Sequence, residues 1–192
     1  RVTAAALGAA LGLGGAVPAV GRRGTLAAAI LSGAAGGAGG IATSIAELPV
    51  TVTVILKAIR DEAEAAGFDP AEPAVRAACL MVFSAGSPLS GDDGVNTSFL
   101  SARMTLTGPA LQKLIATVAP KLAAALGQKL AAQAVPLLGA ISGAGLNAAY
   151  LSYYREVARI RFALMRLTVQ HGAEAVTVRF ARATEAPRLT GG

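Results

Sequence analysis

Apolar residues recur at intervals of three and four along most of the chain, which is the spacing that places them on one face of an α-helix. The clearest example runs from about 140 to 168, where Arg155, Arg159 and Arg166 fall opposite the apolar stripe. Further helices are predicted over 3–16, 25–46, 49–67, 73–86, 97–107 and 109–135. The pattern therefore predicts an all-α, single-domain helical bundle of about six to seven helices.

Prolines and glycines set the expected boundaries of these helices. Pro49 is expected to begin a helix, because the first turn needs no N–H from it, and Pro120 is expected to kink or split another. The glycines from Gly36 to Gly40 indicate either a tightly packed helix or a loop. Residues 87–96 read as a loop. Alternating apolar residues leave a short strand open as the alternative over 50–54 and 176–180.

Two Ala/Gly/Leu-rich stretches, 24–46 and 130–154, contain no Asp, Glu, Lys, Arg or His. Each matches the length of about 20 residues that a membrane-spanning helix needs, but glycines, Pro136 and the lack of flanking charge asymmetry weigh against spanning. Small residues let helical backbones approach closely, so these central helices are expected to pack on each other or on lipid. The glycines assigned to this packing are Gly33, Gly36, Gly37, Gly40, Gly139 and Gly143.

Two polar residues stand out within these apolar surroundings. Glu47 is the sole charge between Gly24 and Leu56, and Asn147 lies inside the second charge-free stretch. A buried carboxylate needs a partner, so we expect Glu47 either to pair within the fold or to face a polar cavity, and we favour the structural role. Asn147 is expected to hydrogen-bond across to another helix.

The composition favours an anionic, apolar partner. Hydrophobic residues make up 54% of the chain and charged residues 15%, against about 25% in typical domains, and the net charge is +6. Because the basic residues are scattered and aromatics are only 4%, a membrane surface fits better than nucleic acid. Two alternatives are open for the basic face formed by Arg155, Arg159 and Arg166. It is either solvated, or it contacts acidic lipid headgroups, with Tyr150 and Tyr153 near the membrane interface.

Catalytic and metal-binding patterns are weak. The glycine run at 36–40 lacks the Lys of a phosphate-binding loop. Ser84 has half of a nucleophile motif, and Cys79 could pair only with the single histidine, His171, but Cys79 lies on an apolar face. One Cys and one His do not make a structural zinc site. We therefore assign no catalytic residue, no metal and no cofactor.

Several ordered segments resemble the bacterial EcsC family. The first is Ala42-Thr43-Ser44-Ile45-Ala46-Glu47-Leu48-Pro49, followed by Gly67-Phe68-Asp69. Others are Cys79-Leu80-Met81-Val82-Phe83, Ala102-Arg103, the run from Val135 to Ala140, Gly143-Ala144-Gly145-Leu146-Asn147, and the ending through Ala158, Phe162, Arg166-Leu167 and Gly172. The resemblance covers roughly residues 25–180. It implies membrane association and, because the family is named for a gene beside an ABC-type exporter, a link to transport. It carries no established catalytic residues.

The expected organisation is one domain over 1–192, with 1–23 and 173–192 peripheral, and the start at Arg1 indicates truncation. The expected function is non-enzymatic binding of membrane lipid or another apolar partner at the cytoplasmic face of the membrane. The alternatives are an accessory subunit of an ABC-type transport complex, and a hydrolase that uses Ser84 or Cys79. No nucleic acid is expected as a partner, and the oligomeric state stays open.

Overall fold

The computed structural model describes residues 21–38, 41–85, 108–132 and 138–184. This part of the chain folds as an all-α, single-domain helical bundle, so the predicted fold class is confirmed. The predicted helices over 3–16 and 97–107, the loop at 87–96, Gly40 and Pro136 lie outside the described residues. The described helices are α2 (Arg22–Ala38), α3 (Ile41–Ala65), α4 (Pro73–Val82), the short 3₁₀ helix η1 (Phe83–Ala85), α5 (Gly108–Ala132), α6 (Leu138–His171) and α7 (Ala173–Thr184).

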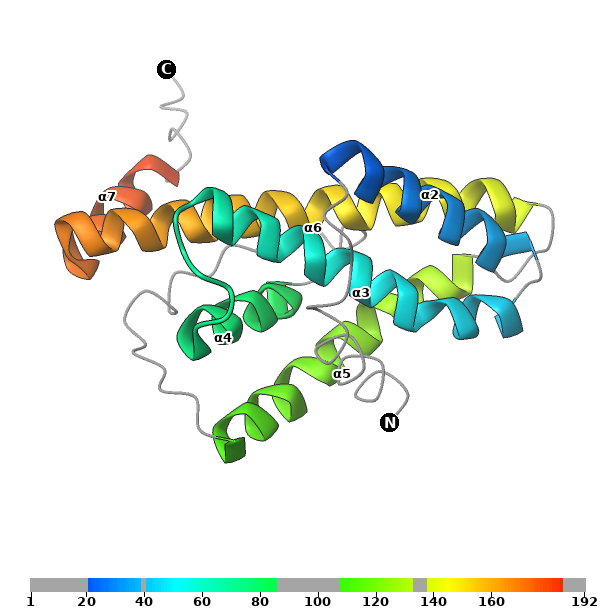
Figure 1. Cartoon of the computed structure of the whole chain (residues 1–192), viewed down its shortest axis with the longest axis horizontal. Coiled ribbons are helices and arrows are strands. Elements are labelled where there is room, and N and C mark those ends of the chain that lie inside the picture. The colour runs from blue at the N-terminus through cyan, green and yellow to red at the C-terminus, as the bar shows by residue number, and fades with distance from the viewer. Residues whose placement is uncertain (1–20, 39–40, 86–107, 133–137, 185–192) are drawn as a thin grey trace, which may run out of the picture.

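The long helix α6 organises the molecule (Figure 1). Helices α2 and α3 lie along it, with α2 against its N-terminal half, while α4 and α5 pack on the other side of α3 (Figure 1). Helix α7 lies at the C-terminal end of α6, after Gly172, whose φ of +84° is a conformation that favours glycine. The charge-free stretches are therefore each divided between two helices, α2 with α3 and α5 with α6.

The structure corrects several expected boundaries. Pro49 lies inside α3 and does not begin it, although its missing N–H removes one helical hydrogen bond. The helix continues because residues on both sides of Pro49 are held in the interior, with Leu48 5% and Val52 0% exposed. Helix α5 likewise continues through Pro120, so of the two expected effects, a kink or a split, the split is wrong. Residues 50–54 and 176–180 are helical, so the strand alternatives are wrong at both places.

The core lies where α3, α4, α5 and α6 meet. The predicted stripe of α3 is almost wholly enclosed, since Val52, Ile55, Leu56, Ile59 and Ala63 are at most 2% exposed. Tyr154 lies at the centre, with the rings of Phe83 and Tyr153 each 5.3 Å from its own between centroids. A smaller cluster, formed by Leu164 and Val176 with Ile160 and Phe180 beside them, holds α7 on α6.

None of the helices in the described ranges combines the length and the apolar character that crossing a membrane requires.

Candidate functional site

Helix α2 approaches α6 so closely that their backbones meet at two glycines. A methyl group added to Gly33 would lie 2.7 Å from the carbonyl carbon of Gly143 and 2.8 Å from Nδ2 of Asn147. A real Cβ atom essentially never comes within 3.0 Å of such neighbours. The α2 backbone at Gly33 therefore lies so close to Gly143 of α6 that only glycine fits at position 33. The immediate surroundings of Gly37, Gly40 and Gly139 lie outside the described residues.

A buried polar cluster lies directly beside this glycine contact. Glu47 is 7% exposed, Thr51 3% and Asn147 1%. Nδ2 of Asn147 donates to Oε1 of Glu47 at 2.6 Å, to the Ala29 carbonyl at 2.9 Å and to Oγ of Ser32 at 3.1 Å. The Thr51 hydroxyl donates to the same Glu47 oxygen at 2.5 Å. The cluster therefore joins α2, α3 and α6 through one amide group.

The chemistry of these neighbours sets the orientation of the Asn147 amide. A carboxylate and a carbonyl only accept hydrogen bonds, so the NH₂ group must point at them. Oδ1 of Asn147 then lies buried without a hydrogen-bond donor among the described residues. Gly36 makes room for the carboxylate, because a methyl group there would lie 2.9 Å from Cδ of Glu47. The Thr43 hydroxyl in α3 also bonds to α2, since it donates to the Gly36 carbonyl at 2.5 Å.

A second charge cluster, with Arg22 exposed and its other two members largely buried, joins the same helices farther along. Oε1 of Glu62 lies 3.7 Å from Nε of Arg155 in α6 and 3.5 Å from Nη2 of Arg22 in α2. The side chains of Glu62 and Arg155 are only 8% and 12% exposed. Burial lowers the pKa of Arg155, and Arg22 lowers it further, while Glu62 and Asp61 act in the opposite direction. We call Arg22, Glu62 and Arg155 the boundary triad, since they lie where the charge-free parts of α2, α3 and α6 end.

The structure separates the residues that were expected to contact headgroups. Tyr150 is fully buried and donates to the Ala125 carbonyl at 2.5 Å, and Tyr153 donates to the Ala85 carbonyl at 2.6 Å. Arg155 is turned inward to Glu62. Tyr150 therefore does not lie at an exposed surface, and Arg155 is paired with Glu62, while headgroup contact by the remaining residues stays a prediction. Arg159 and Arg166 are exposed, with Arg159 paired to Glu156 one turn away.

On the other side of the boundary triad, the described parts of α2, α3 and α6 carry no exposed charge. Glu47 is the only Asp, Glu, Lys, Arg or His in α2 after Arg23, in α3 before Lys57 and in α6 before Arg155, and it is buried. Figure 1 shows these three segments at the same end of the molecule, away from α7. We call this region the charge-free end; its exposed residues in the described part are Ala27, Ile30, Leu31, Ala35, Ala38, Thr43, Ala46, Val50, Gly145, Ala149 and Ser152.

The structure does not bring the candidate catalytic residues together. Cys79 is 2% exposed in α4, and burial raises the pKa of its thiol to about 12, although Arg60 and Arg161 act to lower it. His171 is exposed at the end of α6. The side chain of Ser84 lies outside the described residues. Within the described ranges no three His, Cys, Asp or Glu side chains gather as metal ligands would.

The buried thiol gives a prediction that depends on pH. The thiolate is the reactive form, so we expect iodoacetamide to modify Cys79 in the folded protein only at the rate of unfolding at neutral pH. The unfolded thiol ionises near its ordinary value of 9.0 and the folded thiol near 12, so the free energy of unfolding should fall as pH rises between these values. Mass spectrometry of alkylated protein, with and without urea, measures the first effect. Rapid labelling without urea would contradict the burial of Cys79.

Sequence reasoning missed several residues that the structure makes important. Asn147 lies more than a hundred positions from its partner Ser32 in α2. The members of the boundary triad lie on three different helices. No local sequence pattern marks either set. The pairing of α7 with α6 was also missed. A signal for α7 was present, because Glu174 in its first turn and Arg182 in its last turn suit the helix dipole.

The fold and these clusters define the class: an all-α protein whose glycine-lined helices enclose a polar cluster and end in an uncharged surface. The chain belongs to the EcsC protein family, which it matches over residues 22–167. No curated protein and no solved structure matches the chain. Two of the segments that resemble the family, around Glu47 and around Asn147, meet in the buried polar cluster.

Proposed function

We propose that this protein is a peripheral membrane protein that inserts its charge-free end into one leaflet of an acidic bilayer. The observation that carries the proposal is the exposure of apolar side chains there, with Leu31 69%, Val50 50% and Ile30 39% exposed. No exposed charge interrupts this surface in the described part of the three helices. Large uncharged apolar surfaces are uncommon on monomeric proteins and are typical of binding sites.

The dimensions of this end support insertion to the depth of one leaflet. The part of α2 after Arg23 is about 22 Å long at about 1.5 Å per residue. Half of a bilayer measures about 20–22 Å including headgroups. Insertion to this depth would bring the exposed Arg22 and Arg23 to the headgroups, and Arg159 lies on the same side of the boundary on α6. Each such basic residue contributes about 1 kcal/mol near an acidic leaflet, such as the cytoplasmic one.

This mechanism differs from insertion by two long apolar helices. The glycine-rich sides of α2 and α6 are occupied by each other, through Gly33 and Gly143. The surface available to lipid is therefore the opposite side of α2, which is rich in Ala, Ile and Leu, together with the adjoining starts of α3 and α6. The small residues thus serve the packing of the bundle, and the larger exposed side chains serve the membrane.

Vesicle binding tests the proposal. We expect the protein to sediment with vesicles of phosphatidylglycerol and phosphatidylcholine, and to be released as salt rises. Leu31→Glu and Val50→Glu should each weaken binding about tenfold or more, because each removes buried apolar area and places a carboxylate in lipid. Both positions are exposed, so stability should change by less than about 0.5 kcal/mol.

Val169→Glu is the matched control, because Val169 is 78% exposed but lies on α6 beyond the boundary triad. It should bind vesicles as the unchanged protein does. Equal recovery in the supernatant with and without vesicles would contradict the proposal, as would a Val169→Glu effect as large as that of Leu31→Glu. Failure to bind vesicles together with co-purification on an integral transport complex in mild detergent would favour the accessory-subunit alternative instead.

A further inference from the structure

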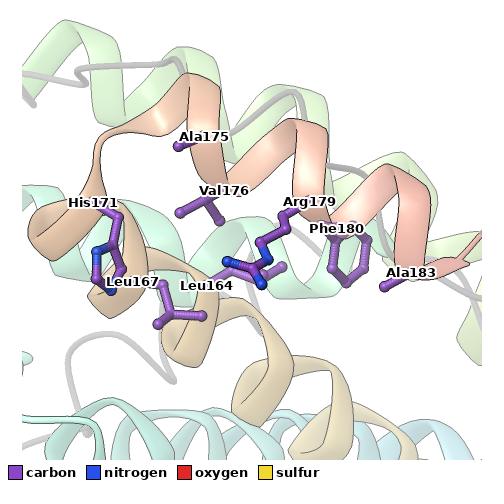
Figure 2. A pocket seen from close by; sticks show the side chains of 8 residues that line it. All are labelled: Leu164, Leu167, His171, Ala175, Val176, Arg179, Phe180 and Ala183. Carbon is purple, nitrogen blue, oxygen red and sulfur yellow. The ribbon is translucent and has the colours of Figure 1, made fainter.

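A separate cavity of about 670 Å³, open to solvent on the side where His171 and Arg179 are exposed, lies at the opposite end of the molecule, between α6 and α7. Its walls are mainly apolar, with Leu164 and Leu167 from α6 facing Val176 and Phe180 from α7 (Figure 2). Its volume falls within the range of about 300–1,000 Å³ that is usual for small-molecule sites. Of its lining residues, only Leu164 and Leu167 lie within the range matched by the family, since that match ends at residue 167.

Two basic side chains line this apolar cavity. The Arg179 side chain points from α7 into the space between the helices, and His171 lies at one end of it (Figure 2). Neither side chain makes a hydrogen bond or an ion pair with another residue that the structure describes. Glu174 does not line the cavity but lies in a shallower hollow that also includes His171 and Arg179. A guanidinium without a counter-charge beside an apolar cavity is complementary to an anion that carries an apolar chain.

We propose that the cavity between α6 and α7 binds a single-chain anionic amphiphile, such as a free fatty acid. The acyl chain lies between Leu164, Leu167, Val176 and Phe180, and the carboxylate pairs with Arg179. This site is independent of the proposed membrane contact, because the charge-free end contains none of its residues. It also gives α7 a role, since α7 supplies Arg179 and the wall that faces α6.

Titration calorimetry with laurate, kept below its micelle concentration, tests this site on the whole chain. We expect saturable binding of about one laurate per chain, and Arg179→Gln should weaken it about tenfold through loss of a charged hydrogen bond. Arg182→Gln is the matched control: it removes the same charge from the same helix, but Arg182 does not line the cavity. Its laurate affinity should stay within about twofold of the unchanged protein.

Two further measurements separate the roles of the head and the chain. Dodecanol, which has the same chain and no charge, should bind more weakly than laurate and should be insensitive to Arg179→Gln. Leu167→Asp should weaken both ligands, and because Leu167 is 40% exposed, circular dichroism should show an unchanged fold. Leu31→Glu should leave laurate binding unchanged, so failure of the membrane proposal and failure of this one are distinguishable.

The proposal would be overturned by any of three results. The first is absence of laurate binding to the unchanged protein. The second is an equal loss with Arg182→Gln and Arg179→Gln, which would mean general attraction to a basic surface. The third is laurate binding that neither Arg179→Gln nor Leu167→Asp weakens, which would place the ligand elsewhere on the molecule.

Discussion

Replacing Gly33 with alanine should lower the free energy of unfolding by about 2–4 kcal/mol, a large effect for the addition of one methyl group. The added carbon would lie 2.7 Å from the carbonyl carbon of Gly143 and 2.8 Å from the amide nitrogen of Asn147. A backbone atom cannot swing aside as a side chain does, so α2 must move away from α6. That movement would also stretch the hydrogen bonds from Asn147 to Ala29 and Ser32. Urea unfolding followed by circular dichroism measures the change.

Gly145→Ala is the matched control for this experiment. Gly145 is also a glycine within a helix of this region, but nothing lies within 4 Å of an added methyl group there. Because alanine is a better helix former, this substitution should stabilise the protein by up to about 1 kcal/mol. Similar effects at Gly33 and Gly145 would show that α2 does not approach α6 as closely as the structure indicates.

Replacing Asn147 with leucine should cost about 3 kcal/mol or more. The leucine side chain is of similar size, so the main effect is the loss of the amide that donates to the buried Glu47 carboxylate at 2.6 Å. A buried charge that loses a hydrogen bond costs more than a neutral group, because no water replaces the donor. Glu47→Leu alone should also destabilise, since the Asn147 amide then loses its charged acceptor.

The double variant Glu47→Leu with Asn147→Leu separates coupling from simple packing effects. Removing both partners leaves neither a charge nor a donor in the apolar interior, so the double variant should be less destabilised than the sum of the single variants by about 1–3 kcal/mol. Urea unfolding of all four proteins completes the cycle. Additive effects would mean that Glu47 and Asn147 do not interact.

Both experiments bear on the proposed function as well as on stability. The charge-free end consists of α2 and the starts of α3 and α6, and the Asn147 amide is bonded to groups on both α2 and α3. If α2 separates from this cluster, the Glu47 carboxylate is uncovered within the surface proposed to enter lipid. A variant such as Gly33→Ala should therefore weaken vesicle binding too, although residue 33 is itself buried.

The helices were largely predictable because their signal is local. Periodic apolar residues identified the buried faces of α3 and α4, including Ile55, Ile59 and Cys79. Pro73 marked the start of α4, and Gly67, with φ of +87°, marked the end of the preceding helix. These features depend on the covalent geometry of a few neighbouring residues, so the sequence alone contains them.

The site residues were less predictable because their roles depend on distant partners. Arg155, Arg159 and Arg166 look alike on a helical projection, yet Arg155 is turned inward to Glu62 and the other two are exposed. Tyr150 was expected near an interface and instead donates to a carbonyl of α5. A periodic pattern shows which face of a helix is polar, but not which other helix covers that face.

The sequence by itself determined the all-α class, the family, and the concentration of small and uncharged residues in two stretches. Only the tertiary structure decided how these stretches are used: α2 is separated from α3, Gly33 of α2 contacts α6, and Asn147 hydrogen-bonds to Glu47. The physical reason is that helix formation depends on contacts four residues apart. The pairing of Glu47 with Asn147, and of Arg155 with Glu62, exists only once packing has brought separate helices within hydrogen-bond or ion-pair distance.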